Sequence, residues 1–335
     1  MNERPLQAGT SERQTILAAA GIDVVPLGGV GATVHGLALA GPEPAAPVRD
    51  ALEQEMAERG FLVFPRETQL SPEAFLRASC WWGGRALHST HSIHPATPEG
   101  NPHIFRLSND PQEGIPGVGP QWHNDGSFLP ETFSHAGYHM VHRAPGGGGT
   151  EFAHQGAAFD ALPEDQQAYF ATLASVNSNT GVVHPLVHVH PRSGRLSLWL
   201  HLGMTGAVVE RQGEVGALRL LEEDEVRALC QAYNAVLNAG FARGDALRFE
   251  YGEGDCVFVD NLAVAHRATA AAHQPRDAQG LRILHRSTVR GEAALAPRFG
   301  LPQRLAIRGP RPAASGLWLA GGVGFRWDET VMYQN

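Results

Sequence analysis

The tripeptide His123-Asn124-Asp125 places an imidazole and a carboxylate two residues apart, a spacing that can serve a metal ion. On an extended strand the side chains at positions i and i+2 point to the same side, so both groups can approach one ion. Taken alone the motif is weak, because so short a pattern also arises as a surface ion pair or a helix N-cap. A metal site therefore needs further ligands from elsewhere in the chain.

A second histidine, His266, follows a hydrophobic stretch far down the chain and offers the missing ligand. Two histidines and one carboxylate make a facial triad, which holds a metal ion from one side and leaves its other positions open. We therefore take His123, Asp125 and His266 as a candidate metal centre.

Residues 281–289 predict a strand that carries two arginines, Arg282 and Arg286, on one face. Guanidinium groups on the inward face of an apolar strand are costly to bury unless they pair with an anion. A dicarboxylate would supply that anion, because a guanidinium binds a carboxylate through two parallel hydrogen bonds. Arg286 has a rival role as a structural ion pair.

The order of these motifs resembles the TauD/TfdA (taurine dioxygenase-like) family, whose members are non-haem Fe(II), 2-oxoglutarate-dependent dioxygenases. The resemblance covers roughly residues 22–292, and several short motifs in the right order are far more specific than one. Its elements are His123-x-Asp125, Gly147-Gly148-Gly149-Thr150, His184-Pro185-Leu186-Val187, residues 190–199, His266 and Arg282-x-x-x-Arg286.

The resemblance implies that His123, Asp125 and His266 bind Fe(II). It also implies that Thr150 and Arg282 hold the far carboxylate of the cosubstrate 2-oxoglutarate. Arg286 would line the pocket for that cosubstrate or for an anionic group of the substrate. The further candidates for the substrate pocket are Gln121, Ser127, His94, Trp199 and Phe258.

The implied activity is hydroxylation of an unactivated C–H bond in a small polar or acid-bearing molecule, such as an amino acid or a natural-product intermediate. O2 would be consumed, and 2-oxoglutarate would be converted to succinate and CO2. Asp125 favours oxygen transfer over halogenation, because related halogenases leave this ligand position to chloride. Gly119 stands where the taurine enzyme carries an amide side chain, which disfavours taurine as the substrate.

Two alternatives stay open beside hydroxylation. Desaturation, cyclisation or C–S/C–N cleavage at the same iron centre are not separated by the sequence. A non-catalytic metal-binding β-barrel module would need no cosubstrate arginines, so Arg282 and Arg286 argue against it.

Many short apolar runs divided by glycine and proline predict a mainly β fold of the jelly-roll type, with a few flanking helices. The resemblance implies a double-stranded β-helix core, as in cupins. Strands are expected near residues 22–25, 32–39, 60–65, 122–128, 134–142, 196–202 and 281–289, and from residue 150 onward, with a hairpin formed by 246–251 and 256–260. Helices are expected near residues 47–59, 163–173 and 222–239, the last one ending at Gly240.

The chain is expected to form one catalytic domain over residues 21–292. Residues 1–20 are polar and predict a flexible tail, whereas 293–335 predict an extension packed on the same domain. Residues 85–120 predict a long ordered loop or lid. The segment 270–280 is an insertion relative to the family, expected beside the mouth of the active site.

The composition excludes several classes of enzyme. The 335 residues include 26 basic and 34 acidic ones, for a net charge of −8, and every basic residue is arginine. Without lysine there is no Schiff-base chemistry, no P-loop and no protein-kinase site.

The same composition bears on partners and location. The acidic balance argues against nucleic acid, and the lack of a long apolar run argues against a membrane. Three distant cysteines without a CxxC pair, and a polar N-terminus, predict a cytoplasmic protein. A small molecule is the expected partner, and a homo-oligomer is an open prospect.

Overall fold

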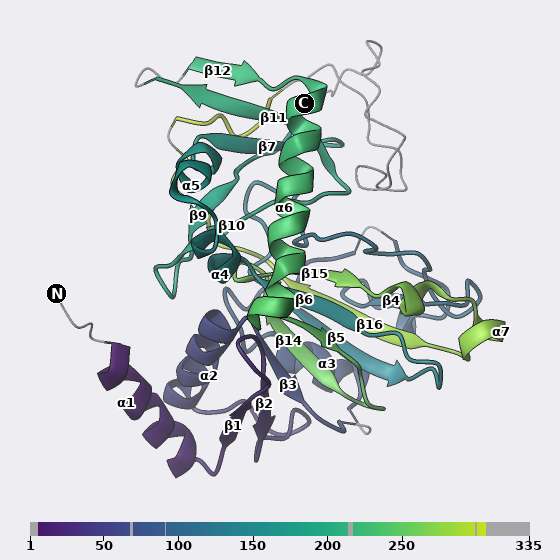
Figure 1. The fold of residues 1–335 in the computed structure, drawn as a ribbon. Coiled ribbons are helices and arrows are strands. Elements are labelled where there is room, and N and C mark those ends of the chain that lie inside the picture. The colour runs from purple at the N-terminus through teal and green to yellow at the C-terminus, as the bar shows by residue number, and fades with distance from the viewer. Residues whose placement is uncertain (1–5, 68–69, 91, 214–216, 299, 306–335) are drawn as a thin grey trace.

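The computed structural model describes residues 6–67, 70–90, 92–213, 217–298 and 300–305. In this part of the chain a seven-stranded sheet packs against a three-stranded sheet. A four-stranded and a two-stranded sheet lie beyond them, towards the top of Figure 1. The expected double-stranded β-helix core is confirmed by this arrangement and by the structural relatives described below.

The large sheet is antiparallel except where its second and third strands run parallel. Its strands, in spatial order, are β1 (Asp23–Pro26), β2 (Ala32–His35), β3 (Phe61–Phe64), β14 (Cys256–Asp260), β5 (His135–His142), β16 (Ile283–Val289) and β4 (Phe105–Ser108). The facing small sheet contains β13 (Ala246–Phe249), β6 (Thr150–His154) and β15 (Val264–Ala268).

The two outer sheets are shorter. The four-stranded sheet has the order β12 (Ala217–Leu220), β11 (Thr205–Gln212), β7 (Leu173–Asn177) and β8 (Val183–Pro185). The two-stranded sheet pairs β10 (Leu196–Leu198) with β9 (Val187–Val189).

The main core lies between the large and small sheets, and strand alternation explains how it is filled. On β14, Val257 and Val259 face the small sheet, whereas Phe258 faces the covering helices, as the period of two requires. Phe61 of β3 and Phe152 of β6 meet across the core with ring centroids 4.3 Å apart. This packing sets the spacing between the two sheets.

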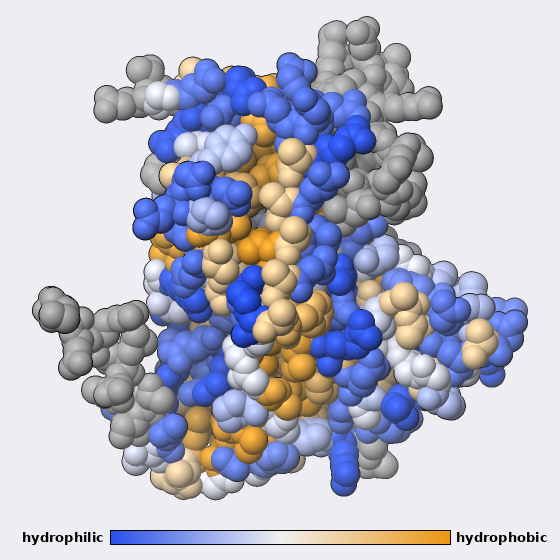
Figure 2. Space-filling view, viewed as in Figure 1, coloured by the Kyte–Doolittle hydropathy of each residue, from blue (hydrophilic) through white to orange (hydrophobic). Residues whose placement is uncertain are grey.

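Helices cover the outer faces. The N-terminal helices α1 (Leu6–Ala19), α2 (Ala46–Arg59) and α3 (Pro72–Ser79) lie on the large sheet, where Phe75 contacts Phe258. The long α6 (Glu223–Arg243), with α4 (Gln155–Asp160) and α5 (Glu164–Phe170), lies on the other side (Figure 1). Figure 2 shows the same face as mostly hydrophilic, with a band of apolar residues along α6.

The expected lid and the insertion contain only short elements. The turn η1 (Pro98–Gly100) and strand β4 interrupt the long loop predicted over residues 85–120. The insertion folds into η2 (Ala270–His273) and α7 (Arg276–Gln279). No helix in the described ranges is long and apolar enough to span a lipid bilayer.

Several local predictions need correction. Residues 246–260 do not form a hairpin, because β13 pairs with β6 while β14 pairs with β3 and β5. His123 lies in an isolated bridge and Asp125 in a turn, so their tripeptide is not a strand. Residues 6–19, within the segment predicted to be a flexible tail, form α1, whose Leu17 is buried in the core.

The predicted C-terminal extension falls partly within the described residues. The backbone N–H of Val189 donates to the Ala296 carbonyl at 2.6 Å, and Leu305 donates to Gly181 at 2.9 Å. These bonds pack the segment 293–305, as far as it is described, against the outer sheets. The rest of the extension lies outside the described residues, and the division into tail, domain and extension stays a prediction.

Candidate metal centre

A pair of backbone hydrogen bonds brings the two candidate histidines together. The N–H of His123 donates to the carbonyl of His266 at 3.0 Å, and the N–H of His266 donates to the carbonyl of His123 at 2.9 Å. The ring centroids are 4.2 Å apart. Because His266 belongs to β15, this bridge attaches the 121–128 loop to the small sheet.

Asp125 is positioned by one asparagine that follows β14. The side chain of Asn261 accepts from the Asp125 N–H at 2.9 Å and donates to the Asp125 carbonyl at 2.8 Å. It also donates to the carbonyl of Phe133 at 2.7 Å, and Thr132 donates to the Asp125 carbonyl at 3.0 Å. The turn that presents the carboxylate is therefore held on both of its backbone groups.

The three side chains converge as a metal ion requires. One ligand atom from each of His123, Asp125 and His266 lies within 4.8 Å of the others, and all three residues are buried. His123 Nδ1 donates to the Gln121 carbonyl at 2.7 Å, which leaves its Nε2 lone pair free for a metal. Two nitrogens and one carboxylate oxygen are the donor set of the facial triad, so the residues fit Fe(II).

Burial and charge set the protonation states that a metal needs. Burial lowers the pKa of His123, and it lowers the pKa of His266 to about 3, so both imidazoles are neutral. Burial, the largest single effect, would raise the pKa of Asp125, but the Arg286 guanidinium and the surrounding histidines together outweigh it and hold that pKa well below its usual range. The site therefore offers two neutral imidazoles and one carboxylate.

Two side chains from neighbouring strands contact the Asp125 carboxylate directly. Arg286 Nη1 donates to Oδ1 at 2.8 Å, and its guanidinium lies over the Phe105 ring, 4.6 Å from the centroid. The Tyr138 hydroxyl lies 3.2 Å from Oδ2 and 2.9 Å from His266 Nε2.

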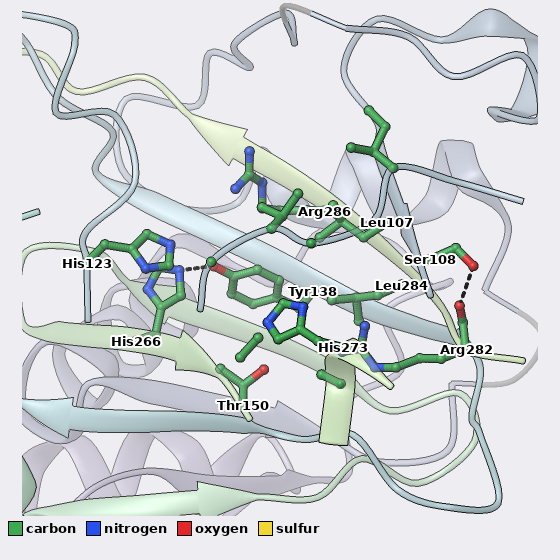
Figure 3. A pocket seen from close by; sticks show the side chains of 16 residues that line it. Leu107, Ser108, His123, Tyr138, Thr150, His266, His273, Arg282, Leu284 and Arg286 are labelled. Carbon is green, nitrogen blue, oxygen red and sulfur yellow. Dashed lines mark hydrogen bonds between the residues drawn. The ribbon is translucent and has the colours of Figure 1, made fainter. Parts of the chain in front are cut away.

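A pocket extends from the triad to Arg282 between the two sheets (Figure 3). Arg282 is 6% exposed, and its Nε donates to the Gly148 carbonyl at 2.9 Å. Within the described ranges no carboxylate forms an ion pair with it, and burial lowers its pKa. Thr150 also lines the pocket and hydrogen-bonds Tyr251 through its Oγ1 at 3.1 Å.

The structure brings together only part of the predicted substrate pocket. Ser127 is near the site and accepts from Asn177 at 3.0 Å, and Gln121 orients His123 through its carbonyl. Other candidates lie away from the pocket that contains the triad. Phe258 packs under the helices, Trp199 is fully buried against two histidine rings, and both ring nitrogens of His94 bond to backbone.

Sequence reasoning missed four residues of the site. Tyr138 and Asn261 contact Asp125. The His201 ring lies tilted beside His123, with ring centroids 4.9 Å apart, and His273 lines the pocket from the insertion. The alternation of β5 places Tyr138 on the inward face with Ala136 and Met140. This alternation was the one sequence signal that Tyr138 points into the space between the sheets.

Comparison with known proteins gives one consistent family. The profile of the taurine catabolism dioxygenase TauD, TfdA family matches residues 23–288. The (S)-phenoxypropionate/alpha-ketoglutarate-dioxygenase of Sphingobium herbicidovorans is 27% identical, covering 81% of this chain and 96% of its own. The alpha-ketoglutarate-dependent sulfate ester dioxygenase of Pseudomonas putida is also 27% identical, covering 81% and 90%.

A solved structure agrees with the fold. A taurine dioxygenase from Burkholderia xenovorans superimposes with a TM-score of 0.68 at 23% identity, covering 89% of this chain and 99% of that one. The profile match spans most of the chain, and the triad stands within it. The chain therefore belongs to the taurine catabolism dioxygenase TauD, TfdA family and is a 2-oxoglutarate-dependent (alpha-ketoglutarate-dependent) dioxygenase that uses Fe(II) and O2.

Proposed function

We propose that this enzyme hydroxylates an unactivated C–H bond of a small polar or acid-bearing molecule and converts 2-oxoglutarate to succinate and CO2. The observation that carries the proposal is the buried guanidinium of Arg282, in a pocket that His123 and His266 of the triad also line. A buried cation without a carboxylate partner among the described residues calls for an anionic ligand. The distal carboxylate of 2-oxoglutarate meets that need.

In this proposal each residue of the pocket has a separate task. His123, Asp125 and His266 hold Fe(II), which together with 2-oxoglutarate supplies the oxidising power for C–H cleavage. Arg282 and Thr150 bind the distal carboxylate at the other end of the pocket. The apolar side chains of Leu107 and Leu284 exclude water along the way (Figure 3).

Arg286 supports an acid-bearing substrate less directly than the sequence suggested. Its Nη1 already pairs with Asp125, as the rival interpretation of a structural ion pair had it. Its buried Nε has no hydrogen-bond partner among the described residues. We propose that an anionic group of the substrate shares this guanidinium, in keeping with relatives that act on phenoxypropionate and sulfate esters.

The test is a screen of candidate carboxylates, sulfonates and sulfate esters, followed by succinate release in the presence of Fe(II), 2-oxoglutarate and O2. A true substrate raises succinate release well above the uncoupled rate and gains one oxygen atom by mass spectrometry. Asp125→Ala is the control, in which substrate-coupled succinate release is expected to be lost. Near-normal coupled turnover in that variant would contradict the assigned triad.

Location and assembly extend the same proposal. The three cysteines are free thiols in the structure, in keeping with a reducing cytoplasm. We further propose that neither a membrane nor a nucleic acid is a partner. Whether the chain forms a homo-oligomer, which the sequence leaves open, is tested by size-exclusion chromatography with light scattering.

A further inference from the structure

Tyr138 packs its ring in the core and places its hydroxyl next to the triad. It is 4% exposed, and its ring belongs to the core between the two sheets. Its hydroxyl is within hydrogen-bond distance of two of the atoms that would bind the metal, His266 Nε2 and Asp125 Oδ2. Figure 3 shows the ring between the histidines and the Arg282 end of the pocket.

The neighbouring strand supplies a second group to the same carboxylate. Tyr138 of β5 and Arg286 of β16 are direct partners across the antiparallel pair. Arg286 donates to Oδ1 of Asp125, and the Tyr138 hydroxyl faces Oδ2. A single cross-strand pair therefore contacts both carboxylate oxygens, and the register of two central strands fixes the orientation of Asp125.

The phenol has one proton and two nearby acceptors, so only one of them can receive it. When His266 binds a metal, its Nε2 lone pair points at the ion and cannot accept a hydrogen bond. The Asp125 carboxylate has further lone pairs and can accept while it binds the ion. In the loaded site the Tyr138 proton therefore belongs to Asp125.

Resting on the proposed metal site, we infer that Tyr138 is a positioning residue of the metal centre. Its hydroxyl donates to the ligand carboxylate, fixes the orientation of that carboxylate and withdraws electron density from it. A phenylalanine would fill the same space in the core but would leave Oδ2 without this donor. The hydroxyl therefore reduces the donor strength of Asp125 towards the metal.

The experiment uses the visible charge-transfer band that forms when Fe(II) and 2-oxoglutarate bind without oxygen. In Tyr138→Phe, Asp125 becomes a stronger donor and raises the energy of the metal electrons. The band is therefore expected to move to longer wavelength than in the wild type. An unmoved band overturns the inference, and a move to shorter wavelength overturns it in favour of a hydrogen bond from Tyr138 to 2-oxoglutarate.

Tyr251→Phe is the matched control, because Tyr251 is also buried but its hydroxyl bonds to Thr150 and not to a residue of the triad. Loss of that hydroxyl is expected to weaken 2-oxoglutarate binding and to leave the band where it is. A shift of equal size in both variants would mean that any buried hydroxyl lost from this core moves the band, and the inference would fail.

A second measurement separates this inference from the proposed function. With Co(II) alone, Tyr138→Phe is expected to shift the d–d absorption bands. Loss of the fixed carboxylate orientation is expected to outweigh the stronger donor and to raise the Kd for the metal about tenfold. If wild-type protein binds Co(II) but forms no band with Fe(II) and 2-oxoglutarate, the cosubstrate proposal fails, and the Co(II) spectra still decide the role of Tyr138. Identical Co(II) spectra and affinities in the two proteins overturn that role.

Discussion

Individual side chains in this site owe their chemical state to their immediate neighbours. His266 is neutral because it is buried, and Asp125 is ionised because Arg286 lies beside it. Arg282 has no such partner among the described residues, so its charge is available to a ligand. This contrast between two arginines four positions apart divides the pocket into a metal end and an anion end.

Arg282→Ala tests the anion end. Removing a charged hydrogen-bond donor from a buried carboxylate site costs about 2 kcal/mol, or about 30-fold in affinity. We expect the Kd of the Mn(II)-loaded protein for 2-oxoglutarate, measured by calorimetry, to rise by that factor. Arg227→Ala, which removes an exposed ion pair on α6, is the control and is expected to bind as the wild type does. An unchanged Kd in Arg282→Ala would show that the carboxylate binds elsewhere.

Asn261→Ala tests the support of Asp125. The substitution removes the partner of the Asp125 N–H and of the Phe133 carbonyl, and it leaves the Asp125 carbonyl with Thr132 alone. We expect a loss of about 3 kcal/mol of stability and a metal affinity about tenfold weaker. Thermal unfolding and Co(II) titration measure the two effects, with the exposed Asn179→Ala as control. Wild-type values in both would refute this role.

At this scale the sequence was sufficient for the ligands and insufficient for their supports. The triad was predicted from residue type and spacing together with the family resemblance. Tyr138 and Asn261 are ordinary residues in apolar runs, and nothing local indicates which buried group they will meet. Phe258 was assigned to the pocket by likeness alone, whereas the alternation of β14 turns it to the helices.

Secondary-structure elements carry the ligands to one another. Hydrophobic alternation predicted most strands, but partner choice is non-local, which is why 246–260 was wrongly expected to be a hairpin. The end of α6 shows a similar limit. The helix ends at Gly244, which has φ of 89°. Gly240 lies within the helix, and it is a glycine because a side chain there would meet Asp245 and Ala246.

The insertion formed by η2 and α7 adds His273 to the pocket. The buried Nε2 of His273 has no hydrogen-bond partner within the described residues, and Figure 3 shows its ring beside the Arg282 guanidinium. A neutral hydrogen bond contributes about 1 kcal/mol, so His273→Ala is expected to raise the Kd for 2-oxoglutarate about fivefold. Calorimetry measures it, with His94→Ala as the control that leaves the Kd unchanged. A raised Kd in His94→Ala with an unchanged Kd in His273→Ala would assign the loop at residue 94, and not the insertion, to the pocket.

The whole molecule carries many buried neutral histidines, and these set its response to acid. Burial lowers the pKa of His154, His184 and His188 to about 4 and that of His285 to about 3. Each folded pKa lies below the ordinary value of 6.5, so the unfolded chain binds more protons between about pH 4 and 6.5. Stability therefore rises with pH through this window and is fully present above it.

We accordingly expect the unfolding temperature of the metal-free protein to fall steeply from pH 6.5 to 5. One such histidine contributes about 1.4 kcal/mol per pH unit, and several act together. His190 opposes them, because Asp260 raises its pKa against the effect of burial. Calorimetry at fixed ionic strength measures the slope, and a flat profile over this range would contradict the buried neutral state.

Composition and alternation were enough to predict two packed sheets with flanking helices. They could not predict which of the 17 histidines are buried in the core, line a pocket or lie at the surface, because the residue type alone does not distinguish these environments. His184 and His188 are buried beside Trp199, while His201 lies beside the triad. Only the three-dimensional packing separates these cases.

The backbone bridge between His123 and His266 determines how the protein acquires its metal. Closing the long stretch of chain between these residues costs conformational entropy, which increases with loop length. The pairing of β15 with β6 and the bridge to His123 offset that entropy without a bound ion. A zinc finger differs, because there the ion itself organises an unfolded chain. We therefore expect iron to leave this enzyme and return while the polypeptide stays folded, which circular dichroism of the chelated protein checks.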